Sequence, residues 1–285
     1  MNRRYHLSPL IFAVLTLSLA VAASPSDAEL LQAIRVKDQG HLTDLQATFW
    51  KQAPAVNVTM LPQVIAIPKN PNASVRSLSV KAAHNGQWLA ILLEWKDLTM
   101  NDRIVSDKFA DQVAVELPVR YRKDALPSPM MGDPGGRVII WQWRAAFQRD
   151  VDKGEPTVRD LYPNTLVDIY PDQVLKAIDV GPYTGALGLD NPISRHKQSP
   201  VLDQIAEGWG TMTVHSDQQA DGKGEWRDGV WRVVITHPLV GVSENQPRLQ
   251  PGDETVIAFA VWDGGNREVG ARKAWSTWIP FRLAK

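Results

Sequence analysis

The sequence contains no cysteine, and this absence excludes several kinds of site. There is no disulfide, no thiolate-bound iron–sulfur cluster and no covalent attachment of a c-type haem. Any cofactor must therefore be held by His, Met, Lys, Tyr or carboxylate side chains. The six histidines are scattered without i, i+3 or i, i+4 spacing, so no local metal-binding motif appears. We expect His84, beside a turn, to be solvated, and His237, before Pro238, is a candidate for a pocket position.

The chain also lacks an excess charge of one sign, catalytic motifs and a long internal apolar run. The 31 Lys and Arg residues balance 31 Asp and Glu residues, which gives no support to nucleic-acid binding. No segment after the N-terminal region approaches the roughly 20 apolar residues of a membrane span, so we expect no stable span. There is no Gly-x-Ser-x-Gly elbow, His-Glu-x-x-His pair or phosphate loop. An enzyme with its own catalytic residues, such as a free-standing hydrolase, is therefore poorly supported.

The N-terminus has the order of a secretory signal peptide. Arg3, Arg4 and His6 come first, an apolar run follows over residues 10–23, and small residues end it. This apolar run is short for a membrane-spanning helix. We expect a signal peptide over residues 1–24, export to the periplasm, and one mature domain over residues 25–285.

Short strands separated by turn residues predict a mostly antiparallel β-sandwich with few helices. Asn85-Gly86 and Asp228-Gly229 are strong two-residue hairpin signals between apolar runs. Trp141 and Trp143 alternate in one expected strand, so they should face the same side. The expected strands cover residues 78–82, 88–95, 111–117, 137–143, 225–236 (a hairpin), 255–261 and 274–283.

Short helices are expected over residues 28–36, 171–177 and 201–207. The second and third lie within residues 148–212, a stretch rich in Pro, Gly, Asp and Asn with weak periodicity. Loops of this length are usually functional or partly disordered. We interpret this stretch as a surface excursion that covers one end of the sandwich.

Four blocks of sequence carry a resemblance to a known family. The blocks are DQVAVELP at 111–118, PMMGDP at 129–134, VIIWQW at 138–143, and FAVWDGG at 259–265 with Arg272-Lys273 and Ser276-Thr277-Trp278. In this order they resemble the haem b-binding γ subunits of periplasmic molybdenum oxidoreductases, a family that includes subunits of ethylbenzene and dimethylsulfide dehydrogenases and of chlorate and selenate reductases. The resemblance implies a β-sandwich that holds one haem b, without a covalent link, between one methionine and one lysine.

Carried over to this sequence, the resemblance places the axial lysine at Lys273 and the methionine at Met130 or Met131. We favour Met131, because the following Gly132 lets the backbone approach a ligand face closely. The other methionines considered, Met60, Met100 and Met212, are more simply core or loop fillers. Only a neutral amine coordinates iron, and holding a lysine neutral at pH 7 costs roughly 4 to 5 kcal/mol. Two protein ligands leave no open position on iron, which suits electron transfer rather than catalysis.

The remaining cofactor contacts are expected from aromatic and basic side chains. Trp143 is predicted to contact the haem, and Arg272 or Arg144 to pair with a propionate. Two readings stay open for Trp141, Trp143, Trp262 and Trp278, which either flank the porphyrin or belong to the sandwich core.

The resemblance implies a heterotrimer with an iron–sulfur beta subunit and a molybdenum alpha subunit. A soluble periplasmic carrier would exchange electrons with it, in a direction that the sequence leaves open. The alternative is a haem-free sandwich that binds a carbohydrate or small ligand, since eleven tryptophans offer flat faces for such ligands.

Overall fold

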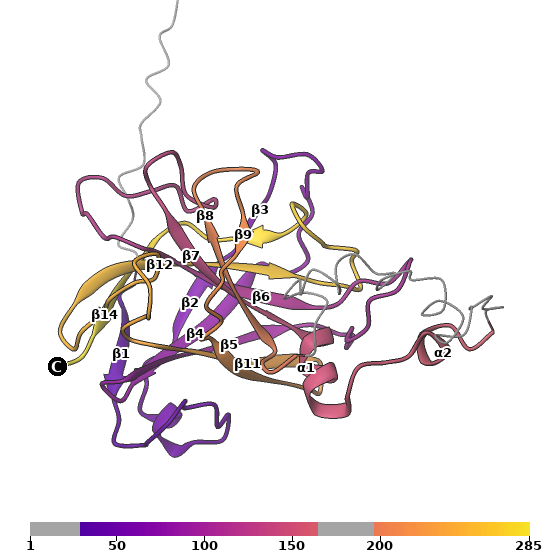
Figure 1. The fold of residues 1–285 in the computed structure, drawn as a ribbon, viewed down its shortest axis with the longest axis horizontal. Helices are drawn as coiled ribbons and strands as arrows, with labels where there is room; N and C mark the ends of the chain where they lie inside the picture. The colour runs from indigo at the N-terminus through magenta and orange to yellow at the C-terminus, as the bar shows by residue number, and fades with distance from the viewer. Residues whose placement is uncertain (1–28, 165–196) are drawn as a thin grey trace, which may run out of the picture.

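Strands are the main regular structure of the described residues (Figure 1). Along each strand, successive side chains point to opposite faces. The computed structural model describes residues 29–164 and 197–285. A 3-10 helix covers Thr48–Lys51, and the α-helices are α1 (Ala145–Lys153) and α2 (Val158–Leu161). No helix among the described residues is long and apolar enough to cross a membrane. The strands are β1 (Leu31–Arg35), β2 (Val56–Thr59), β3 (Leu61–Pro62), β4 (Ser77–His84), β5 (Trp88–Lys96), β6 (Gln112–Pro118), β7 (Val138–Arg144), β8 (Val201–Ala206), β9 (Thr213–Val214), β10 (Asp221–Arg227), β11 (Val230–Pro238), β12 (Glu254–Trp262), β13 (Ala274–Trp275) and β14 (Ile279–Leu283).

The strands form two layers that are joined through β12. The hydrogen-bonded order is β10-β11-β5-β4-β1-β14-β12-β6-β7-β8-β9. The first half of β12 pairs with β14 and its second half pairs with β6. β12 therefore belongs to both layers, and the sheet passes from one layer to the other along it. β1 is parallel to both of its neighbours, and the other pairs are antiparallel. The predicted β-sandwich, mostly antiparallel, is confirmed.

The main core lies between the two layers and is rich in aromatic side chains. Trp143 of β7 packs edge-on against Trp231 of β11, with ring centroids 5.0 Å apart. Trp141 stacks on His237 of β11 at 4.5 Å. Trp141 and Trp143 therefore face the same side, as predicted, and that side is the core. His237 is fully buried there, and burial lowers its pKa to about 4, so it is neutral at pH 7.

Gly224 of β10 leaves space that the Trp143 ring fills. A Cβ atom at position 224 would overlap that ring. We therefore expect Gly224→Ala to lower the free energy of unfolding by about 1–3 kcal/mol, because overpacking forces the ring or the strand to move. Urea unfolding of this variant and of Glu225→Ala, an exposed neighbour on the same strand, measures the effect. Equal stability of the two variants would contradict this packing.

Several local predictions are wrong, and pairing with distant strands explains most of them. Residues 28–36 were predicted as a helix, but β1 lies between β4 and β14 with Leu31 and Ala33 buried on one side. Residues 201–207 form strand β8 instead of a helix, because they pair with β7 and β9. The expected closing strand is divided into β13 and β14, which pair with different halves of β12. Their second partners also differ, since β13 pairs with β3 and β14 with β1.

Two further expectations need correction. His84 is fully buried rather than solvated, because the C-terminal residues lie beside it and its Nε2 lies 2.8 Å from the Ala284 carbonyl oxygen. The stretch 148–212 is more than a surface excursion, since it contains most of α1, all of α2 and the internal strand β8. The predicted signal peptide and the helix over 171–177 lie outside the described residues.

Candidate functional site

A pocket lies on the outer face of β6, β7 and β12, which is the face opposite the main core. Alternation along each strand creates this face, because side chains next to core residues point the other way. The pocket has a volume of about 460 Å³, within the range of cofactor sites. Its floor is formed by Gln112, Ala114 and Glu116 of β6, Ile140, Gln142 and Arg144 of β7, and Ala260 and Trp262 of β12.

Loops from five parts of the chain form the walls of this pocket. They bring mainly apolar side chains, including Phe109, Val269 and Trp275. Ile104, Trp209 and Met212 line the pocket while remaining about half exposed to solvent, so they lie toward its mouth. The combination of an apolar lining and a few polar groups is typical of sites for small molecules and cofactors.

Met130 and Met131 enter the pocket from a turn that is held by backbone hydrogen bonds. The Gly132 N–H donates to the Ser128 carbonyl at 2.9 Å, and the Gly208 N–H donates to the Met131 carbonyl at 2.8 Å. Met131 has a φ of 71°, in the left-handed region that non-glycine residues seldom adopt. Such strain persists only where the surroundings impose it, and it is concentrated at functional sites.

Lys273 enters the same pocket at the end of the segment 263–272, just before β13. Glu268 is fully buried and holds this segment, accepting hydrogen bonds from Asn70 at 2.9 Å and from the Asp263 N–H at 3.1 Å. Gln63 donates to the Ala271 carbonyl at 3.0 Å. The Lys273 ammonium lies 5.5 Å from the centroid of the Trp262 ring. The segment that positions Lys273 is thus held by hydrogen bonds near both of its ends.

The interior of the pocket disfavours charge. Burial lowers the pKa of Lys273, and the nearby Glu116 carboxylate opposes this shift. Burial raises the pKa of Glu116 to about 8, against the opposing effect of Lys273 and a backbone hydrogen bond from Met131. The Glu116 Oε1 atom is buried without a hydrogen-bond partner. Removing the proton from Lys273 therefore costs less free energy than removing it from an exposed lysine.

Arg144 supplies the fixed positive charge of the floor. It donates to the Gln142 side chain at 3.0 Å, and Gln142 in turn donates to Gln112 at 2.7 Å. Burial lowers the pKa of Arg144 to about 10, which leaves it protonated at pH 7. Its Nε atom is buried without a partner. A carboxylate of a bound molecule would satisfy both the charge and the free N–H.

The structure brings together most, but not all, of the residues predicted for the site. Met130, Met131, Lys273, Arg144 and Trp262 line one pocket.

Four other candidates lie elsewhere. Trp141 and Trp143 are in the main core, and Arg272 is absent from the pocket lining although it adjoins Lys273. Trp278 is absent from the pocket lining, but it packs against the cluster that contains Ile140 and Trp262 of the floor. Its indole N–H donates to the Pro127 carbonyl at 2.6 Å.

Sequence reasoning missed Glu116, Gln112 and Gln142. Each is a polar residue inside an otherwise apolar strand, and the two in β6 are an even number of positions apart. This alternation indicates that the strand has a partly polar face opposite its core face, and it is the sequence signal that could have identified these pocket residues.

The sequence profile of the family described as ethylbenzene dehydrogenase matches residues 47–160 and 192–274. These ranges hold the Met130-Met131 turn, the floor strands and Lys273. The chain belongs to this family. The resemblance drawn from the four sequence blocks is thereby confirmed.

Known proteins with sequences similar to this member of the ethylbenzene dehydrogenase family are named as subunits of enzymes. The gamma subunit of chlorate reductase from Ideonella dechloratans is 28% identical over 90% of this chain and 84% of its own. The gamma subunit of dimethylsulfide dehydrogenase from Rhodovulum sulfidophilum is 24% identical over 90% of this chain and 82% of its own. A candidate heme subunit of a respiratory nitrate reductase from Haloferax mediterranei is 25% identical over 92% of this chain and 75% of its own.

Among solved structures, a carbohydrate-binding module of family 9 from Caldicellulosiruptor kristjanssonii, in complex with glucose, resembles this chain. The TM-score is 0.43 with 10% sequence identity, covering 90% of this chain and 97% of the module. At that score the likeness carries no argument about what this member of the ethylbenzene dehydrogenase family binds.

Proposed function

We propose that this protein is an electron-transfer subunit that binds one non-covalent haem b in the pocket, with Met131 and Lys273 as the axial ligands. The observation that carries the proposal is that the two methionines of one turn and the lysine of a distant segment line the same apolar cavity. The two segments are far apart in sequence, and each is held in place by hydrogen bonds.

The donors present suit a haem group. Haem supplies one-electron chemistry when bound, and a thioether ligand raises its reduction potential. The chain provides the thioether of Met131, the amine of Lys273, an apolar lining, and Arg144 as a partner for a propionate. Lys273 must lose its proton to act as a ligand, and its burial lowers the free energy required. Glu116 is the nearby group able to take that proton, because burial raises its pKa to about 8.

The relatives support a place in a larger enzyme. Because two of them are named as gamma subunits, we infer that this chain is a non-catalytic subunit of a molybdenum oxidoreductase. It would exchange electrons with an iron–sulfur subunit on one side and a soluble carrier on the other, beside a molybdenum-containing catalytic subunit. The proposed location is the periplasm, reached through the N-terminal signal peptide.

Variants of the two adjacent methionines test the axial assignment. We expect Met131→Ala to lose the spectrum of six-coordinate haem and to lower the reduction potential, because one soft ligand is gone. Met130→Ala should keep both properties, and Met100→Ala, in an exposed loop, serves as a matched control. Visible spectra of the oxidised and reduced proteins and a redox titration measure the effect. If Met130→Ala alone changes the spectrum, the ligand is Met130 instead.

A further inference from the structure

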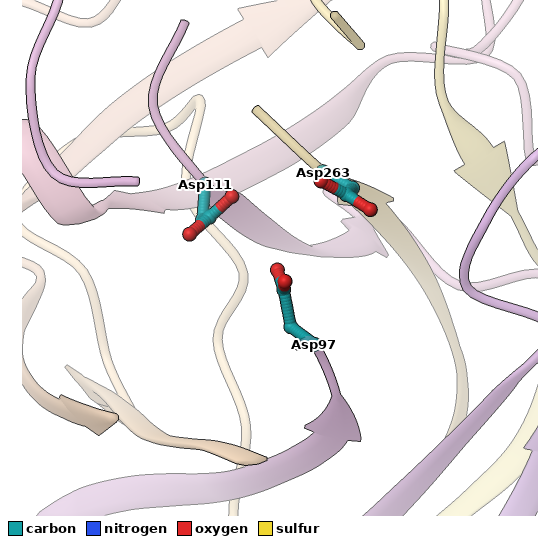
Figure 2. Close-up of side chains that lie close together, drawn as sticks. All are labelled: Asp97, Asp111 and Asp263. Atoms are coloured by element: carbon teal, nitrogen blue, oxygen red, sulfur yellow. The ribbon is translucent and has the colours of Figure 1, made fainter. Parts of the chain in front are cut away.

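Three aspartates that no step of the proposed electron transfer uses lie together at neighbouring strand ends (Figure 2). Asp97 follows β5, Asp111 precedes β6, and Asp263 follows β12. One carboxylate oxygen of each lies within 4.8 Å of the others, and the three side chains point toward one another. Asp97 and Asp111 are buried, whereas Asp263 is half-buried.

The existing hydrogen bonds leave part of this cluster unsatisfied. Asp111 accepts three hydrogen bonds. They come from the backbone N–H groups of Gly264 at 2.8 Å and Asn101 at 2.7 Å and from the indole N–H of Trp231 at 2.9 Å. Asp97 is different: its Oδ1 accepts from the Thr99 N–H at 3.0 Å, but its Oδ2 is buried with no partner. That oxygen belongs to a side chain that is only 5% exposed and whose carboxylate points toward the space between the other two.

Among the described residues, no ion pair balances the negative charge of the cluster. In the part of the chain that the structure describes, no Lys, Arg or His forms an ion pair with any of the three aspartates. Burial and the charge of Asp97 raise the pKa of Asp111 to about 7, and burial and Asp263 raise the pKa of Asp97. Buried carboxylates at this spacing must share a proton or hold a cation.

Two further oxygen atoms lie near one member of the cluster. A Cβ atom built on Gly265 would lie 2.7 Å from Thr99 Oγ1, 3.0 Å from Asn101 Oδ1 and 3.1 Å from Asp263 Oδ1. A hydroxyl and an amide oxygen, hydrogen-bonded to each other at 2.8 Å, therefore lie on the same side of Gly265 as the Asp263 carboxylate. The site offers oxygen only, without histidine or cysteine, which selects hard cations over zinc or copper. Calcium takes six to eight oxygens in flexible geometry, whereas magnesium keeps several waters and suits a buried site less well.

We propose that Asp97, Asp111 and Asp263 bind a calcium ion that joins the ends of β5, β6 and β12. The position has a structural consequence. Asp263 opens the segment that ends at Lys273, and Asp111 directly precedes Gln112 in the floor of the pocket. The cation would thus fix the start of the lysine-bearing segment. The cation site does not depend on what occupies the apolar pocket.

Calcium titration of the full chain, first stripped with EDTA, tests this site. We expect one calcium per chain by isothermal titration calorimetry. The unfolding temperature should rise by roughly 5 °C or more when free calcium is about 100 times Kd. Asp263→Asn should weaken calcium binding at least about ten-fold, since a charged ligand is lost. In EDTA the same variant should unfold at or above the wild-type temperature, because charge repulsion is relieved.

Asp228→Asn provides the matched control. It removes one carboxylate from an exposed hairpin turn and keeps a residue type that tolerates the positive φ there, so its calcium response should equal that of the wild type. The proposal is overturned if the wild type shows neither stoichiometric binding nor a thermal shift, which is the result for aspartates sharing a proton. An unchanged calcium affinity in Asp263→Asn overturns it as well.

Discussion

Lys273→Ala is expected to reduce the haem content of the purified protein, or its haem affinity, by at least about ten-fold. Changes that only reorient a metal ligand already cost about 10–100-fold in affinity, and this change removes a proposed ligand entirely. Haem that remains should be five-coordinate, with a high-spin spectrum, because no other amine lines the described pocket. Pyridine haemochrome content and the visible spectrum measure both effects.

Lys223→Ala is the control for this experiment. Lys223 is exposed on β10 and lies outside the pocket, so its loss removes the same charge without touching the site. If both lysine variants retain the wild-type spectrum, Lys273 is not an axial ligand, even when haem is present.

Trp143→Ala is expected to lower the free energy of unfolding of the haem-free protein by about 3–5 kcal/mol. Trp143 is completely buried in the main core, packs on Trp231, and donates to the Gln148 side chain at 3.2 Å. Its removal leaves a cavity between the two layers that rigid strands cannot close. In urea, the unfolding midpoint should fall by about 1 M or more.

The matched control is Trp209→Ala, which removes a tryptophan that is 54% exposed at the mouth of the pocket. Its haem-free stability should change by no more than about 0.5 kcal/mol. The comparison also separates two roles for Trp143. A residue that only contacted haem would leave haem-free stability unchanged and alter the spectrum, and that outcome would contradict its placement in the core.

Local chemistry explains why the hairpins were predictable. Asn85-Gly86 and Asp228-Gly229 have left-handed conformations available, and the apolar runs on either side must pair to bury their side chains. The structure has β4 and β5 around the first turn and β10 and β11 around the second. Here the necessary information lies within a few residues.

Pairing between distant segments explains what was missed. Residues 31–35 and 201–206 become strands because parallel and antiparallel partners far away in sequence accept their hydrogen bonds. The same limit applies to Trp143: alternation showed that it shares a side with Trp141, but not which side is the core. Once the core is known, the opposite face of β6 and β7 becomes the floor of the pocket.

The candidate ligands were predicted by resemblance and not by periodicity. Lys273 follows a Gly-containing segment that alone indicates only a loop, and Met130-Met131 is an ordinary dipeptide. Lys273 and the two methionines come together in space because buried Glu268 holds one segment and backbone hydrogen bonds hold the methionine turn. The partners Asn70 and Gly208 lie far away in sequence. Glu116 was missed because its effect depends on burial beside Lys273.

The visible spectrum of the purified full chain, with its haem quantified, tests the central claim most directly. We expect about one non-covalent haem b per chain, extractable into acidified organic solvent, with a Soret band and sharp α and β bands on reduction. A well-folded protein with none of these bands after exposure to haem would contradict it and favour a haem-free ligand-binding sandwich.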